Sequence, residues 1–196
     1  MTDRRCAAPT AHNVHQYEML GADYRCTGAA PVWPVSQAGH DVAAAIIVEL
    51  DKAVDTMTIH KLLYLCQAWS LGLRGVPLFD DRIEAAGNGP RLPGIYAHHG
   101  STPSFRDWPD GDPIRLEEAA RLIVHGVVQN YGAKSGPALS RMTREDDCWA
   151  EEWIASDAGR RGIHTISEQA IHAEYRERAL RSRKRAERRE RVAALG

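Results

Sequence analysis

Apolar residues recur at intervals of three and four in the first half of the chain, most regularly between Thr58 and Leu73. The apolar positions in this segment are Ile59, Leu62, Leu63, Cys66, Trp69 and Leu73. Because this spacing gathers them on one side of an α-helix, it predicts a helix that Thr58 can cap. Gly75 and Pro77 end it, since proline lacks a backbone donor and fixes its own φ.

Two weaker patterns predict helices elsewhere in the chain. Residues 41–55 have apolar side chains at helical spacing and predict an amphipathic helix. A similar pattern runs from Pro113 or Leu116 to Tyr131, and Gly132 follows it as a stop signal. The apolar positions of this helix are expected to face inward.

The last third of the chain predicts two more helices. Thr143 is followed by acidic residues that suit the positive end of a helix, so we expect a helix to open there. Trp149 and Trp153 are four residues apart and should share a face of that helix. Ser167 is the expected cap of a final helix that continues into the basic end of the chain.

Glycine and proline interrupt the pattern in residues 76–100, which predicts repeated turns and a short β pair or irregular ribbon. Residues 1–37 show no sustained periodicity and are expected to form an irregular N-terminal extension. The fold class predicted is mainly α: a compact helical domain over residues 38–178, followed by a basic helical tail over 179–196.

Composition adds little to this picture, but charge adds one feature. The chain has 196 residues, of which 43% are hydrophobic, and its longest purely apolar run is Val42 to Val48. This run is too short to span a bilayer, and the first residues lack an apolar leader, so we expect a cytoplasmic protein without a membrane partner. Net charge is −1 overall, yet residues 176–191 hold nine basic and three acidic residues. The body is therefore acidic and the tail basic.

Candidate catalytic and metal-binding residues form no coherent set. Cys66 and His60 lie six apart on one predicted helix, so they face different directions, and Cys66 is expected to be a core residue. A ligand set of Cys6, His12, His15 and Cys26 matches no common zinc spacing, and His98 with His99 is expected on a surface loop. We expect no catalytic, cofactor-binding or metal-binding residues, and therefore no enzyme.

Two charged segments could each serve more than one role. Asp80, Asp81 and Glu84 could act as paired carboxylates, but they are expected in an exposed turn as solvated charges. The basic tail could neutralise nucleic-acid phosphates or contact an acidic protein. Nucleic acid remains an open but less favoured partner, because the tail carries no interleaved aromatic residues for base stacking.

Four segments, taken in order, resemble the Panacea domain, an antitoxin domain typified by the SocA proteolytic adaptor and found in phage-associated GepA-like proteins. They are KLLYLCQAWSLGLRGVPLFDDRIEA at 61–85, GNGPRLPGIY at 87–96, YGAKSGPALSRMTREDDCW at 131–149 and ISEQAIHAEYRE at 166–177. The chain departs from the family pattern at three positions. The family favours an aromatic residue at Ala86, an aromatic residue or histidine at Asn88, and histidine at Arg144. The motif residues given structural roles are Lys61, Leu62, Leu63, Tyr64, Trp69, Gly89, Pro90, Pro93, Tyr96, Thr143 and Trp149.

The resemblance implies an antitoxin that binds a separately encoded protein toxin, the product of a neighbouring gene in a prophage-like setting. Exposed members among Phe79, Arg82, Arg91 and Tyr96 are the candidate toxin contacts, since aromatic and arginine side chains dominate many interfaces. Two alternatives stay open. One is an adaptor that delivers the toxin to a ClpXP-type protease, and the other is a nucleic-acid-binding regulator that uses the arginine-rich tail.

Overall fold

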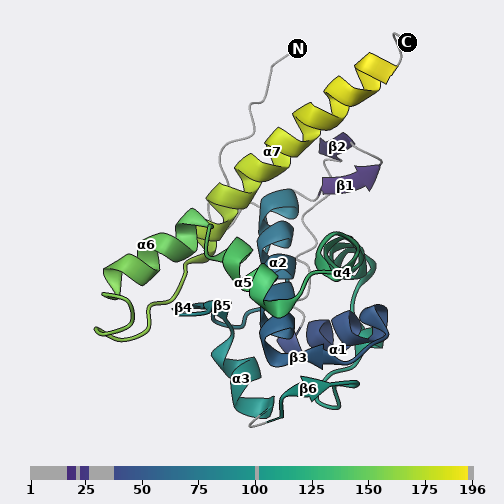
Figure 1. Ribbon diagram of the computed structural model, residues 1–196. Coiled ribbons are helices and arrows are strands. Elements are labelled where there is room, and N and C mark those ends of the chain that lie inside the picture. Colours follow the sequence, from purple (N-terminus) through teal and green to yellow (C-terminus); the bar gives the residue numbers. More distant parts are fainter. Residues whose placement is uncertain (1–16, 21–22, 27–37, 100–101, 194–196) are drawn as a thin grey trace.

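A computed structural model describes residues 17–20, 23–26, 38–99 and 102–193 (Figure 1). The fold is mainly α with short antiparallel strand pairs, as predicted. The elements are β1 (Tyr17–Leu20), β2 (Asp23–Cys26), α1 (Gly39–Leu50), β3 (Val54–Asp55), α2 (Thr56–Arg74), β4 (Glu84–Ala86), β5 (Gly89–Arg91), α3 (Pro93–His99), β6 (Ser104–Phe105), the 3-10 helix η1 (Pro113–Arg115), α4 (Glu118–Tyr131), α5 (Gly136–Thr143), α6 (Asp147–Ala155) and α7 (Glu168–Ala193).

Helix α2 lies at the centre and is covered by α1, α4, α5 and α7 (Figure 1). Most of its apolar stripe is buried, while Trp69 and Leu73 are partly buried, and Leu62, Leu63 and Tyr64 have no exposed surface. The polar residues between them are buried too, including Lys61 and Gln67. A helix buried all round can keep such residues only if each finds a partner, which is what makes this helix the foundation of the candidate site.

The predicted start of α2 is shifted by two residues. Thr58 does not cap the helix; Asp55 does, and its Oδ1 accepts from the Thr58 backbone N–H at 2.8 Å. The Thr58 hydroxyl donates to the other carboxylate oxygen at 2.7 Å, so both side chains fix the first turn. Gly75 ends the helix as predicted, with a φ of +72°.

Helix α5 was not predicted, and the expected helix start at Thr143 is wrong. Thr143 is the last residue of α5, where its hydroxyl donates to the Leu139 carbonyl at 3.0 Å. The signal for α5 is a short one: Ser135 accepts from the Ala138 N–H at 3.4 Å, and Pro137 occupies the first turn. Helix α6 then begins at Asp147, and Trp149 stacks on Trp153 with ring centroids 5.8 Å apart.

The glycine- and proline-rich region contains the predicted β pair. Strands β4 and β5 are antiparallel, with Glu84 opposite Arg91 and Ala86 opposite Gly89. Helix α3 follows within the same region and was not anticipated. Strands β1 and β2 also pair, inside the stretch expected to be irregular.

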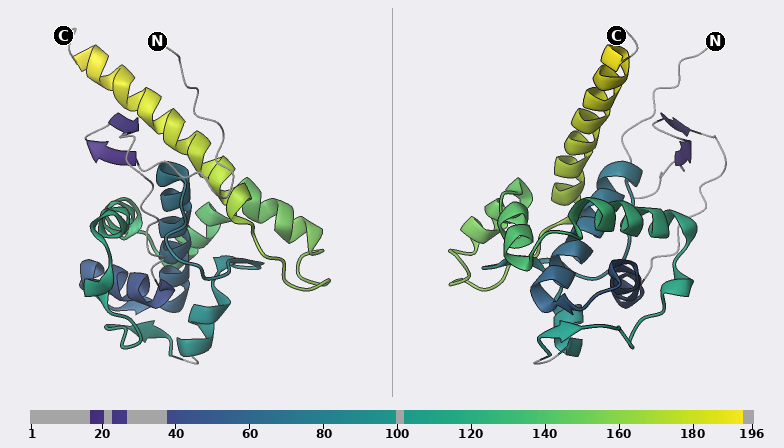
Figure 2. Two further views of the ribbon diagram at one scale, coloured as in Figure 1. Left: turned by 180° about the vertical axis from the view of Figure 1, so that it is seen from behind. Right: turned by 45° about the vertical axis from the view of Figure 1, so that its right-hand side comes forward.

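Helix α7 is the longest element of the described chain and begins after Ser167, as predicted. The Ser167 hydroxyl accepts from the Ala170 N–H at 3.2 Å. The helix crosses α2 so closely that a Cβ on Gly72 would lie 2.7 Å from the Tyr175 carbonyl carbon. Beyond this crossing α7 leaves the body (Figure 2). Among the described helices none combines the length and apolarity needed to cross a membrane.

Candidate functional site

The ammonium of Lys61 is buried beneath the β4–β5 hairpin. Its Nζ donates to the Pro90 carbonyl at 2.7 Å, which ties α2 to β5. Gly89 sits beside this contact with a φ of +92°, and a Cβ there would lie 2.9 Å from the Thr143 hydroxyl and 3.2 Å from the Lys61 Cε. Four motif residues from three elements therefore meet at one point.

The environment of Lys61 disfavours its charge. Burial is the main cause, and the positive charges of Arg144 and Arg91 add to it, so that the pKa of Lys61 is lowered to about 7. The amine thus changes charge near neutral pH. Within the described residues it has one hydrogen-bond acceptor, the Pro90 carbonyl.

The tip of the hairpin is held by α5 and α6. The Trp149 indole N–H donates to the Ala86 carbonyl at 3.1 Å, and Ser140 donates its hydroxyl to the Asn88 carbonyl at 2.8 Å. Arg144 reaches the Gly87 carbonyl at 3.4 Å. These three contacts satisfy carbonyls of the turn and leave it little freedom to move.

The side of the hairpin that faces solvent carries arginine and tyrosine. Glu84 accepts ion pairs from Arg82 at 2.6 Å and from Arg91 at 3.2 Å. The Arg91 guanidinium also lies over the Tyr96 ring, 5.6 Å from its centroid, and Tyr96 is 51% exposed. We call Arg82, Arg91 and Tyr96 the hairpin face.

Two expectations for this region need correction. Phe79 is completely buried, so it does not belong with the exposed candidate contacts. It is held in place by Gln67, whose side-chain carbonyl accepts from the Leu78 and Phe79 backbone N–H groups at 2.7 and 3.2 Å. Glu84 is also buried, at 5% exposure, rather than solvated in a turn, because it lies in β4 between two arginines.

A second polar cluster joins α2, α6 and α7 around Asp146. The hydroxyls of Tyr64 and Tyr175 donate to its Oδ2 at 2.6 and 2.8 Å. The Arg178 guanidinium lies 2.8 Å from its Oδ1. Burial raises the pKa of Asp146, and the hydrogen bonds from Tyr64 and Tyr175 and the positive charge of Arg178 oppose that rise.

Sequence reasoning did not identify this cluster. Tyr64 was assigned to the central helix and Asp146 only to a favourable helix end. The partners lie 82 and 29 residues apart, so no local pattern joins them. Of the remaining motif residues, Leu62 and Leu63 lie in the core, and the Trp69 indole donates to the Tyr131 hydroxyl at 3.1 Å. Pro93 opens α3.

The candidate catalytic residues are not assembled into a reactive group. Cys66 is fully buried, and burial raises its pKa, so its thiol stays protonated. His60 is also buried, and its Nδ1 accepts from the Leu92 N–H at 3.3 Å. Across the described ranges no group of three or more His, Cys, Asp or Glu residues is placed to hold a metal ion. The set of Cys6, His12, His15 and Cys26 falls outside the residues whose side chains are described.

Comparison with known proteins supports the resemblance seen in the sequence. Residues 59–150 match the family model described as "Antitoxin SocA-like, Panacea domain". No curated protein and no solved structure gave a match. The matched segment runs from the first turn of α2 into α6 and contains Lys61, the β4–β5 hairpin and Thr143. The likeness to the Panacea antitoxin domain is therefore confirmed over residues 59–150.

Proposed function

We propose that this protein is an antitoxin that neutralises a separately encoded protein toxin by direct binding, with the hairpin face as its contact surface. The family match supports an antitoxin-like role. The observation that carries the proposal is the convergence of Lys61, Gly89 and Thr143 beneath the hairpin, inside the matched segment. These residues brace the hairpin from below and leave its outer side chains available to a partner.

Rigidity of the hairpin favours binding. A surface that is already ordered loses little conformational entropy when a partner docks. The turn carbonyls of Ala86 and Asn88 are bonded to Trp149 and Ser140, so the backbone is fixed before any partner arrives. Arg91 is partly fixed as well, through Glu84 and the Tyr96 ring.

The chemistry of the hairpin face is that of a binding hot spot. Arginine and tyrosine are enriched where interfaces derive most of their free energy. Arg82 has 60% of its side chain exposed, and Tyr96 exposes half of its surface. The face can therefore offer both hydrogen-bond donors and an aromatic ring to the toxin.

Co-expression with the product of the adjacent gene tests the proposal. We expect the antitoxin to restore growth and to co-purify with that product. The double variant Arg91→Ala/Tyr96→Ala should weaken the complex by about 10- to 100-fold, the usual effect of removing hot-spot side chains. Glu84 keeps Arg82 as a partner in this variant, so the fold should persist.

A matched control is Arg106→Ala/Ile114→Ala, which removes an exposed arginine and an exposed apolar residue outside the hairpin face. It should bind like the parent protein. Equal weakening by both variants, or no complex with the parent protein, would contradict the proposal. The lifetime of the toxin distinguishes the two mechanisms of neutralisation. A pure inhibitor leaves the lifetime of the toxin unchanged or longer, whereas an adaptor to a ClpXP-type protease shortens it.

A further inference from the structure

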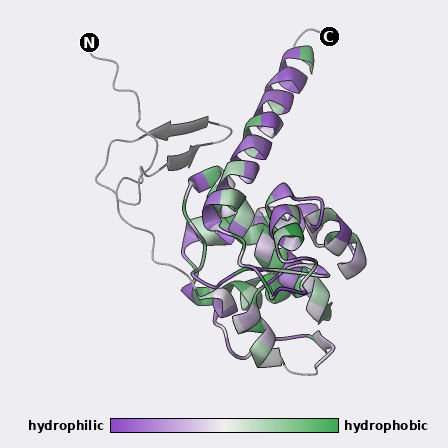
Figure 3. Ribbon diagram, turned by 90° about the vertical axis from the view of Figure 1, so that its left-hand side faces the viewer, coloured by the Kyte–Doolittle hydropathy of each residue, from purple (hydrophilic) through white to green (hydrophobic). Residues whose placement is uncertain are grey.

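The second half of α7 forms a helical arm, defined here as residues 181–193. It extends beyond the body and is mostly hydrophilic (Figure 3). Of its side chains only Glu187 is partly buried. The last buried residue of α7 is Tyr175, so the arm takes no part in the core.

The arm concentrates positive charge and neutralises only part of it. It holds seven basic and two acidic residues, a net charge of +5. Arg181 pairs with Glu177 and Arg183 with Glu187. The structure pairs the other five cations with no carboxylate among the described residues: Lys184, Arg185, Arg188, Arg189 and Arg191.

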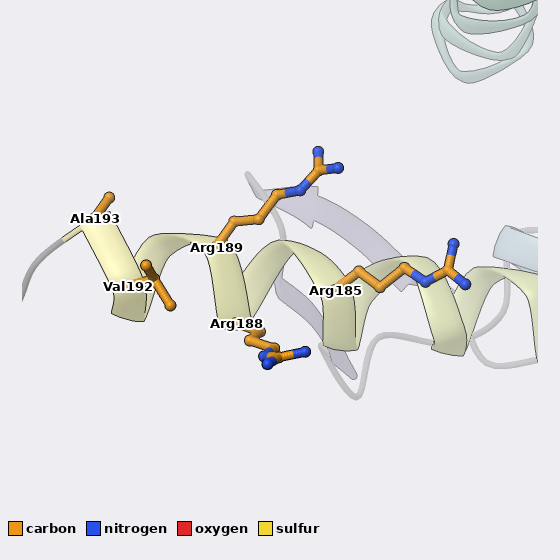
Figure 4. A pocket seen from close by; sticks show the side chains of 5 residues that line it. All are labelled: Arg185, Arg188, Arg189, Val192 and Ala193. Atoms are coloured by element: carbon orange, nitrogen blue, oxygen red, sulfur yellow. The ribbon is translucent and has the colours of Figure 1, made fainter.

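Helical geometry places these cations on one side. At about 100° per residue, the cations other than Arg183 fall within about 160° of the circumference, with Val192 among them. The rest of the circumference carries Ser182, Ala193, Ala186, Glu190, Arg183 and Glu187. Figure 4 shows Arg185 and Arg189 extending from one edge of the helix and Arg188 from the other edge. The three arginines line a pocket together with Val192 and Ala193. The arm is thus a cationic stripe about 15 Å long between Arg181 and Arg191.

The composition of the stripe selects among anionic partners. A helix that binds a membrane surface needs large apolar residues opposite its charges, and here that side carries serine, alanine, two glutamates and Arg183. A protein partner would be held mainly by buried apolar anchors, and the arm offers only Val192. Phosphate contacts need only cations, and the absence of aromatic rings on the arm argues against stacking on single-stranded bases.

We propose that the arm binds the phosphate backbone of double-stranded nucleic acid without reading its sequence. The charge of the rest of the chain supports binding through the arm. The whole chain has a net charge of −1 and the arm has +5, so the other residues together carry −6. The acidic body is repelled by phosphates and the arm is attracted to them. The arm lies outside the segment that matches the antitoxin family, so this proposal does not depend on toxin binding.

The test measures fluorescence anisotropy of a labelled 20-base-pair DNA duplex with the full chain between 50 and 200 mM KCl. Five phosphate contacts predict a slope of about −4.5 in log affinity against log salt, or a Kd that rises by about 500-fold over this range. Arg185→Gln/Arg188→Gln/Arg189→Gln should reduce the slope to about −1.8 and weaken binding at 50 mM by about 100-fold or more. Glutamine keeps the helix propensity of arginine.

The matched control replaces three exposed arginines of the body, Arg106, Arg141 and Arg161, by glutamine and removes the same total charge. It should bind the duplex within about twofold of the parent protein. No duplex binding at 50 mM salt, or equal losses in the two triple variants, would overturn the proposal. Tighter binding to poly-glutamate or to a single strand of equal length would also overturn it, and would point to an acidic protein or to single-stranded nucleic acid instead.

Discussion

Lys61 shows how one residue can link stability to pH in this protein. Its amine is buried among cations and has the Pro90 carbonyl as its acceptor. In the folded chain the neutral amine is favoured above about pH 7, whereas in the unfolded chain lysine keeps its proton to about pH 10. Between these values the unfolded state binds more protons, so the free energy of unfolding rises with pH.

We expect that rise to reach up to about 2 kcal/mol between pH 7 and 8.5. Above about pH 8.5 the buried thiols of Cys66 and Cys148 act in the opposite sense, because burial raises their pKa and only the unfolded chain releases their protons. Lys61→Met should remove the rise, and Lys134→Met, at an exposed lysine, should keep it. Urea unfolding of the two variants at three pH values measures the rise. If the free energy of unfolding of Lys61→Met still rose with pH, another titrating group would be responsible.

Asp146 is the common partner of two hydroxyl donors and one guanidinium. Asp146→Ala leaves the Tyr64 and Tyr175 hydroxyls and the Arg178 guanidinium without their common acceptor. We expect the free energy of unfolding to fall by about 2 to 5 kcal/mol, mainly because two buried hydroxyls lose their acceptor. Arg178 is partly exposed and keeps Glu174 as a partner, so it adds little to the loss. Asp147→Ala, at the exposed neighbour, should lower it by less than about 1 kcal/mol. Similar losses in the two variants, measured by urea unfolding, would contradict this role for Asp146.

The residues that could be predicted are those whose partners lie nearby in sequence. Trp149 and Trp153 stack as their spacing indicated, and Gly75 ends α2 with a positive φ. The partners of Tyr64 and Lys61 come from distant segments, so no spacing reveals them. Phe79 shows where prediction from neighbouring residues fails. Its neighbours in sequence are turn residues and aspartates, yet it is buried in the core, where the Gln67 side chain bonds to its backbone.

Among the elements, the β4–β5 hairpin depends most on a single backbone conformation. Gly89→Ala would place a methyl group 2.9 Å from the Thr143 hydroxyl, at a φ of +92° that L-residues rarely adopt. We expect it to destabilise the fold by about 2 to 4 kcal/mol, through strain and the shift of Thr143.

The control for this prediction is Gly75→Ala. Gly75 also has a positive φ, at +72°, but an added Cβ meets nothing within 4 Å. It should lose only the backbone preference, about 1 kcal/mol. Thermal unfolding of both variants separates the effect of the Thr143 contact from the effect of the positive φ. Equal losses of stability in the two variants would show that the close approach of Thr143 to Gly89 contributes nothing.

Helices were predictable where a stripe was long and a stop signal clear. The helix ending at Tyr131 was placed correctly because Gly132 follows it, although its first turn is the separate 3-10 helix η1. Helix α5 has only eight residues, which is too few for a periodic pattern to register. Thr143 then looked like a first residue because the acidic residues after it suit the start of α6.

At the scale of the whole molecule, the arm should be dispensable for stability. A chain that stops after Ser182 keeps Tyr175 and Arg178, and we expect its Tm to change by less than about 2 °C. A chain that stops after Ile171 loses both residues and should melt at least about 10 °C lower or fail to fold. Circular dichroism melts compare the two, and a large drop in the first would mean that the arm is part of the cooperative unit.

The division of charge between body and tail was visible in the sequence, because it depends on composition alone. That the tail leaves the body as a continuation of α7 depends on where Tyr175 and Arg178 anchor the helix. Such anchoring is a property of the assembled fold, and helix propensity along the tail does not determine it.

The close crossing of α2 and α7 at Gly72 turns the last helix into a lever. From Tyr175 to Ala193 the rod is about 27 Å long, so a rotation of about 10° at the crossing displaces its tip by about 5 Å. A single methyl group added at Gly72 would push on α7 at this crossing. A probe attached to the tip would then report a change too small to notice at the pivot itself.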